Sequence, residues 1–277
     1  MPRVLLIGSD HEFKTRLADC DGLAGCEIES AAGNVDALRH VRRRAFEVVI
    51  TDPSTPVSDD LALVNELRAV RPGLKAIVLA PAAAPAEFIA AIRSQVFACF
   101  VAPFDAGHVA DMTRLALEAV DWRDGISVES GLPEWLSLTV SCRHLTAERL
   151  IQFMNEYRRD LAADDRDDLM TAFREMLMNA MEHGAGFDPE KVVTVTAIRT
   201  GRAIVYHFRD PGSGFTRSEL ERSALSEAEA DPIAHLQRRA GLGLRPGGFG
   251  MLVTRQVVDE MYYSERGNEV LLIKRLA

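Results

Sequence analysis

The hydrophobic pattern of this chain changes near its middle, and this change constrains the fold more than any other feature. The first 120 residues alternate short apolar runs with amphipathic segments of helix length, a pattern typical of parallel strands joined by crossover helices. Strands are expected at residues 4–7, 27–31, 48–51, 76–80 and 99–102. The first half therefore predicts a doubly wound domain with a five-stranded parallel sheet.

The second half of the chain has an α+β pattern instead. Apolar and polar residues alternate on both sides of Thr200-Gly201, which predicts an antiparallel hairpin of residues 192–198 and 203–209. Helices are expected at about 145–162, 166–183 and 250–260, further strands at 136–140 and 269–275, and a loop over much of 212–248. The fold class is thus α/β, with two domains of different architecture.

A polar, turn-rich stretch around residues 121–131 separates the two patterns. We accordingly divide the chain into a first domain at 1–122, a linker at 123–134 and a second domain at 135–277. A length of 277 residues is about twice that of a typical domain, which agrees with this division.

Composition and charge exclude several classes of protein. A net charge of −9, from 32 basic and 41 acidic residues, disfavours direct binding of nucleic acid. No apolar run approaches the roughly 20 residues that a membrane helix needs, and the N-terminal apolar run is too short for a signal peptide. The four cysteines lack C-x-x-C spacing, so neither a zinc site nor a disulfide framework is predicted. We expect a cytoplasmic protein with reduced thiols and no membrane partner.

The densest group of chemically active side chains lies in the helix predicted at 166–183. Glu175, Asn179 and His183 recur at intervals of four residues, so they share one stripe of an α-helix and can address a single ligand. A polar stripe is by itself more typical of a solvated surface. Further motifs are therefore needed to identify a site here.

Two glycine motifs follow this helix. Asp210-Pro211-Gly212-Ser213-Gly214-Phe215 comes directly after a predicted strand, where glycines allow the backbone to approach a ligand closely. Gly247-Gly248-Phe249-Gly250 runs into the last predicted helix, where free backbone N–H groups attract phosphate. Each motif is weak alone, whereas the three segments together in this order are much more specific.

The three segments resemble the N, G1 and G2 boxes of the GHKL superfamily of histidine kinase-like ATPases. The likeness is closest to its anti-sigma-factor serine/threonine kinase branch, which also has a tail similar to Gly267-Asn268-Glu269-Val270-Leu271-Leu272-Ile273-Lys274. The resemblance spans about 135–277 and implies the family's Bergerat-type ATP-binding α/β sandwich, with ATP and Mg²⁺ as cofactors.

The resemblance implies a role for each matching polar residue. Glu175 would be the general base that takes a proton from the attacking hydroxyl or water. Asn179 would bind Mg²⁺ through its side-chain oxygen, together with phosphate oxygens and water. Asp210 would accept a hydrogen bond from the adenine amino group.

The matching glycines would contact the nucleotide through the backbone. Gly212 and Gly214 would let the chain pass close to the base, and Gly248 and Gly250 would present N–H groups to the phosphates. His183 would be a further donor to the phosphates. Phosphoryl transfer needs mainly positioning and charge neutralisation, so this set of residues suffices for a kinase or an ATPase.

The first half of the chain resembles a response-regulator receiver, which has a flavodoxin-like fold. Asp52 ends the apolar run Val48-Val49-Ile50-Thr51, and Pro56 follows four residues later, as in the D-x-x-x-P motif around a receiver's phosphoaccepting aspartate. Asp52 is therefore the candidate phosphoacceptor of this domain.

The departures from the receiver pattern indicate a degenerate domain. Gly8 and Ser9 stand where receivers have two acidic metal ligands, and only Asp10 follows. Ala80 replaces a hydroxyl residue and Ala102 replaces a lysine. Because developing phosphoryl charge would be poorly neutralised, we expect a module for protein contacts or dimerisation rather than an efficient phosphoacceptor.

The combined resemblances predict a signal-transduction protein. The expected activity is Mg·ATP-dependent phosphorylation of serine or threonine on a partner protein, such as an anti-sigma antagonist or a sigma factor, and the family suggests a homodimer. One alternative is an ATP-gated protein-binding module or scaffold with little catalysis. Another is an unorthodox histidine kinase that uses a partner's histidine or His11, although Arg16 stands where a histidine-box proline is expected.

Overall fold

The computed structural model describes the whole chain except residues 9, 83, 121, 124, 215–249 and 277. The chain folds into two compact units. Unit 1 consists of Met1–Asp124 together with Glu148–Tyr157, and unit 2 consists of Gly125–Ala147 together with Arg158–Ala277.

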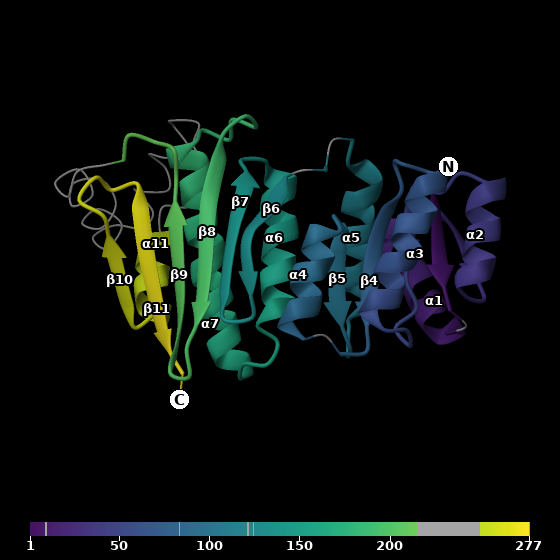
Figure 1. The fold of residues 1–277 in the computed structure, drawn as a ribbon, viewed down its shortest axis with the longest axis horizontal. Helices are drawn as coiled ribbons and strands as arrows, with labels where there is room; N and C mark the ends of the chain where they lie inside the picture. The colour runs from purple at the N-terminus through teal and green to yellow at the C-terminus, as the bar shows by residue number, and fades with distance from the viewer. Residues whose placement is uncertain (9, 83, 121, 124, 215–249, 277) are drawn as a thin grey trace. The chain divides into compact units, whose positions relative to one another are not determined.

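Unit 1 is built on a five-stranded parallel sheet (Figure 1). Its strands lie in the order β2-β1-β3-β4-β5, with bounds β1 (Arg3–Ile7), β2 (Glu27–Ala31), β3 (Val48–Ile50), β4 (Lys75–Ala80) and β5 (Ala98–Val101). The helices of Met1–Asp124 are α1 (His11–Ala18), η1 (Asp21–Leu23), α2 (Asn34–Arg43), α3 (Val57–Val70), α4 (Pro85–Arg93) and α5 (Ala106–Glu118). This strand order is flavodoxin-like, which confirms the predicted doubly wound fold.

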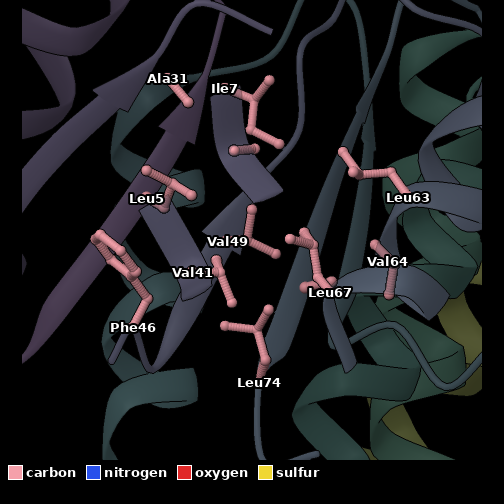
Figure 2. Close-up of a cluster of buried hydrophobic side chains, with 12 residues drawn as sticks. Leu5, Ile7, Ala31, Val41, Phe46, Val49, Leu63, Val64, Leu67 and Leu74 are labelled. Atoms are coloured by element: carbon pink, nitrogen blue, oxygen red, sulfur yellow. The ribbon is translucent and has the colours of Figure 1, made fainter. Parts of the chain in front are cut away.

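The core of unit 1 explains why its central strands, β3 and β4, are mostly apolar. Every residue of β3 and β4 is buried, as expected for central parallel strands that are covered on both faces. Figure 2 shows how strand residues meet helix residues in one cluster, which includes Leu5, Ile7 and Val49 from the sheet and Val41, Leu63, Val64 and Leu67 from α2 and α3.

The outer edge of β5 is closed by a helix rather than by another strand. The last ten residues of α6 (His144–Tyr157) belong to unit 1. Gln152 donates from Nε2 to the Cys99 carbonyl (2.6 Å) and accepts from the Cys99 N–H (3.3 Å). Glu156 accepts from the Val101 N–H (3.1 Å). These side chains satisfy backbone groups that an exposed edge strand would leave unpaired.

Arg149 extends this edge contact one turn earlier in α6. The residue is 2% exposed, and its guanidinium donates to three backbone carbonyls, those of Phe97 (3.1 Å), Val96 (3.1 Å) and Trp122 (2.7 Å). Burial lowers its pKa to about 10, so the group stays charged at neutral pH. A buried cation is acceptable here because carbonyl oxygens replace its water.

Unit 2 contains a six-stranded antiparallel sheet in the order β10-β11-β9-β8-β7-β6. The strands are β6 (Ile126–Leu132), β7 (Trp135–Ser141), β8 (Val192–Arg199), β9 (Ala203–Arg209), β10 (Glu260–Tyr263) and β11 (Glu269–Arg275). The described helical elements that follow α6 are α7 (Ala163–Asn179), η2 (Ala180–Gly184) and α11 (Gly250–Val257). The predicted hairpin is confirmed as β8 and β9.

Helix α7 packs on one face of this sheet. Phe173 lies against Tyr206 and Phe208 of β9, with ring centroids 4.9 and 5.2 Å apart. Alternate residues of β7, β8 and β9 are buried, as expected for a sheet that has one face covered. This layer of helix on sheet confirms the predicted α+β architecture of the second domain.

The structure differs from the sequence expectations in two segments, and a third expected segment lies mostly outside the described residues. Residues 123–134, expected to be a linker, include β6, which pairs with β7 and has a bulge between Val128 and Ser130. Strand β10 was not expected. The expected loop at 212–248 lies outside the described residues beyond Gly214. Among the helices that the structure describes, none is long and apolar enough to cross a membrane.

Candidate functional site

The polar residues predicted on one helix stripe lie at the end of α7. Glu175 and Asn179 are half-buried and keep α-helical spacing, with Asn179 as the last residue of α7. The chain then turns into the π-helical segment η2, in which His183 is exposed. The predicted α-helical stripe therefore includes Glu175 and Asn179, while His183 lies in a turn of different pitch. Such π-helical turns occur frequently at functional sites.

The end of η2 packs against the first glycine motif. A Cβ at Gly184 would collide with the side chain of Asp210, so only glycine fits at this approach. Gly212 donates its N–H to Asp210 Oδ1 (2.8 Å). Burial raises the pKa of Asp210, while the Gly212 N–H and Arg266 act in the opposite direction. The half-buried carboxyl of Asp210 is thus fixed beside the end of the helix that holds Glu175 and Asn179.

The turn after Asp210 contacts two residues to which no role was assigned from the sequence, Arg266 and Asn268. The backbone carbonyl of Asn268 accepts from the Asp210 N–H (3.0 Å), and the side-chain Nδ2 of Asn268 donates to the Asp210 backbone carbonyl (3.2 Å). Gly214 has φ +78°, and a Cβ there would collide with the Arg266 carbonyl. The similarity of the tail around Gly267-Asn268 to the family was the available signal for this contact.

The second glycine motif also meets this helix, through Gly250. Gly250 begins α11, and a Cβ on it would collide with the carboxylate of Glu175. Gly248 lies outside the described residues, so its predicted phosphate contact stays a prediction. The structure therefore brings Glu175 to Gly250, and Asp210 to Gly184 and Gly212, around the C-terminal half of α7 and η2.

The residues of this region fit Mg·ATP by their chemistry. Asp210 offers a fixed carboxylate that can accept from an amino group, and a Cβ at Gly212 would fill the space 2.8 Å from that carboxylate and from the Gly184 carbonyl. Asn179 offers a neutral oxygen of the kind that Mg²⁺ accepts beside phosphate oxygens. The N-terminus of α11 offers N–H groups for phosphate. The individual roles of these residues stay predictions.

Asp52 of unit 1 lies at the carboxyl end of β3, separated from the strand by Thr51. Ser54 donates to Asp52 Oδ1 from its N–H (2.9 Å) and its hydroxyl (2.8 Å). A Cβ at Gly8 would lie 2.9 Å from Asp52 Oδ2, so glycine keeps the carboxylate close to the end of β1. Asp10 accepts from the Phe13 N–H as the N-cap of α1. In the part of the chain that is described, no group of three or more His, Cys, Asp or Glu residues could hold a metal ion.

Comparison with known proteins finds two kinds of similarity in this chain. Residues 140–274 match the family described as the histidine kinase-like ATPase domain. A response regulator receiver protein of Anaeromyxobacter sp. is 29% identical over 112 residues, which are 40% of this chain and 47% of that protein. The transcriptional regulatory protein PrrA of Mycobacterium tuberculosis is 26% identical over 103 residues, 37% of this chain and 44% of that protein. The chain thus spans less than half of the length of these curated relatives.

Solved structures similar to this chain include receiver domains. A CheY-like receiver domain protein from Methanospirillum hungatei is 19% identical, with a TM-score of 0.38, and covers 43% of this chain and 94% of its own. A response regulator from Thermotoga maritima is 16% identical, with a TM-score of 0.39, and covers 43% of this chain and 99% of its own.

Proposed function

We propose that this chain, in which a receiver-like domain is joined to a histidine kinase-like ATPase domain, is an Mg·ATP-dependent serine/threonine kinase that acts on a partner protein in signal transduction. The observation that supports the proposal best is the meeting of both glycine motifs at one helix, through Glu175 with Gly250 and Asp210 with Gly184. The partner is proposed to be an anti-sigma antagonist or a sigma factor, and the receiver-like unit a regulatory domain.

Each side chain of the site has a defined task in this proposal. Asp210 accepts from the amino group of adenine, and Asn179 offers its oxygen to the metal. Glu175 accepts the proton of the attacking serine or threonine hydroxyl. When bound, Mg·ATP would supply the phosphoryl group and the cation that neutralises its charge. Gly250 lets α11 begin against Glu175, which places N–H groups near the general base.

The surroundings of His11 disfavour its role as a phosphoacceptor. His11 is the first residue of α1, directly after the N-cap Asp10, and it follows β1 of the receiver-like sheet. A helix start inside that domain differs from the dimerisation helix on which a histidine kinase presents its acceptor. We therefore favour a serine or threonine hydroxyl as the acceptor.

The first test is calorimetric titration of the full chain with a non-hydrolysable ATP analogue, with and without Mg²⁺. We expect Mg²⁺-dependent binding that Asn179→Ala weakens by about tenfold or more, because the variant removes one metal ligand. Asn155→Ala is the matched control, since Asn155 is exposed on α6 and should leave the affinity unchanged. Equal affinity of Asn179→Ala and wild type would count against the assignment of the site.

The second test separates catalysis from nucleotide-gated binding. Glu175→Gln should bind the analogue like wild type but transfer phosphate to an antagonist protein about 100-fold more slowly or worse. Label that is stable to acid would identify serine or threonine, whereas acid-labile label would indicate histidine. Normal binding with no transfer by wild type, and no effect of Glu175→Gln on turnover, would leave the ATP-gated binding module as the better description.

A further inference from the structure

A buried carboxyl group lies beneath the loop of unit 1 that contains Asp52. Asp60, in the first turn of α3, is 1% exposed. Its hydrogen-bond partners among the described residues are Thr51 and Thr55. A carboxyl group is costly to bury, so its hydrogen bonds indicate what it does.

Two threonines that flank Asp52 bind the two oxygens of Asp60. The Thr51 hydroxyl lies 2.8 Å from Asp60 Oδ2 and accepts from the Leu79 N–H of β4 (3.1 Å). The Thr55 hydroxyl lies 2.5 Å from Asp60 Oδ1 and 2.8 Å from the Asp52 carbonyl oxygen. Asp60 thus ties both ends of the Asp52 loop to α3 and, through Thr51, to β4.

Counting protons determines the charge that fits this arrangement. A threonine hydroxyl has one proton, so Thr55 can donate either to the Asp52 carbonyl or to Asp60, but not to both. If Asp60 were ionised, one of these two close oxygen pairs would have no proton between its members. With a proton on Asp60 Oδ1, Asp60 donates to Thr55, Thr55 donates to the Asp52 carbonyl, and Thr51 donates to Asp60 Oδ2. Every contact in the network is then a hydrogen bond.

We propose that Asp60 is a proton-binding site that controls the loop around Asp52, so that unit 1 responds to pH as an input signal. In the protonated state the loop is held by the complete network. When Asp60 loses its proton, the Thr55 hydroxyl turns to the carboxylate, and the Asp52 carbonyl loses the bond from that hydroxyl and keeps only the bond from the Thr55 N–H (3.2 Å). The loop that holds Asp52 is thereby loosened at its C-terminal end.

The electrostatic surroundings of Asp60 bring its loss of a proton into the physiological pH range. Burial raises the pKa of Asp60 to about 6, against the lowering effect of its bonds to Thr55 and Thr51. The carboxylates of Asp52 and Asp59 raise it further, because each would repel a second negative charge. The thiol of Cys99 on β5 also lies within electrostatic range, and burial raises its pKa well above neutrality, so it stays uncharged.

Nuclear magnetic resonance of the full chain tests the proposal directly. In wild type, the Asp60 carboxyl carbon and the amides of Thr55 and Leu79 should titrate together with a midpoint near pH 6. Independence of these signals from pH between 5 and 7.5 would overturn the proposal without any need for a variant. The test does not depend on kinase activity.

Two asparagine variants sharpen the test. Asp60→Asn has the same shape, donates to Thr55 and accepts from Thr51, so it should hold the loop in its low-pH state across the whole range. Asp59→Asn is the control on the same helix turn, and it should keep the transition with a slightly lower midpoint. A transition at Thr55 and Leu79 that persists in Asp60→Asn would show that another group is responsible and would refute the assignment.

Discussion

Gly250, the first residue of α11, packs directly against the carboxylate of Glu175 on α7. The two residues are 75 positions apart in the sequence, and no side chain larger than hydrogen fits between them. This contact joins the last glycine motif to the helix of the proposed general base. Phosphoryl transfer depends mainly on positioning, and a misplacement of about 1 Å can slow an enzymatic reaction by about 100-fold.

Replacement of Gly250 should therefore disturb catalysis more than folding. In Gly250→Ala the new methyl group must displace the Glu175 carboxylate, and we expect phosphoryl transfer to slow by about 10- to 100-fold. Alanine favours helix by up to about 1 kcal/mol over glycine, so the variant should still fold. Gly201→Ala is the matched control, because the space around Gly201 is open. The measurement is the steady-state turnover of wild type, Gly250→Ala and Gly201→Ala. Unchanged turnover in Gly250→Ala would contradict the proposed geometry.

Asp210 should determine which base the site accepts. A carboxylate acceptor favours a purine with an amino group at position 6 over one with an oxo group. Asp210→Asn replaces a charged acceptor and should weaken binding of an ATP analogue by about 10- to 100-fold. The same substitution should weaken binding of the corresponding inosine nucleotide much less. Calorimetric titration of wild type and variant with both nucleotides gives the loss of affinity for each. Equal losses of affinity for the two nucleotides would argue against a contact with the amino group.

Nucleotide binding should also weaken on acidification. Burial raises the pKa of Asp210 above its ordinary value of 3.8, so the group becomes protonated at a higher pH than an exposed aspartate. The acceptor is present above this raised pKa and is lost as the pH falls through it. Affinity for the ATP analogue should therefore decline on the acid side of neutrality in wild type. The same pH series with Asp210→Asn should be flatter, and parallel curves would assign the decline to another group.

Arg149 should be essential for the stability of unit 1. Arg149→Met keeps the aliphatic stem but leaves the carbonyls of Val96, Phe97 and Trp122 without their donor. We expect a loss of about 3 kcal/mol or more in the free energy of unfolding of this unit. Arg42→Met, on the exposed surface of α2, is the control and should change stability by less than about 0.5 kcal/mol. Urea unfolding monitored by the fluorescence of the buried Trp122, with Trp135 of unit 2 replaced by phenylalanine in every protein compared, reports on unit 1.

Sequence patterns predicted the elements of both units well where the signal was local. The central strands β3 and β4 of unit 1 are buried along their whole length because both faces are covered, and the β8–β9 hairpin alternates because one face is covered. The sequence missed β6, whose polar residues and bulge give no clear period. Residues 126–132 form a strand because their backbone groups hydrogen-bond to those of β7.

The candidate site was predictable in its motifs but not in its contacts. Glu175, Asn179 and Asp210 were recognised from spacing and resemblance, since those motifs are contiguous in the chain. The hydrogen bond from Asn268 to Asp210 and the packing of the π-helical turn Ala180–Gly184 depend on how distant segments fold together. The protonation network of Asp60 likewise required Thr51, Thr55 and Leu79 to be placed in space.

The sequence by itself determined the two fold classes and the order of most elements, and it supplied the candidate site residues, because periodicity and short motifs are local properties. Only the tertiary structure decided that Glu148–Tyr157 of α6 belongs with the receiver-like sheet, where Gln152 and Glu156 bind the backbone of β5. Only it decided that Gly250 touches Glu175. Such contacts join residues far apart in the chain, and their free energy depends on burial and on hydrogen-bond partners that no local pattern specifies.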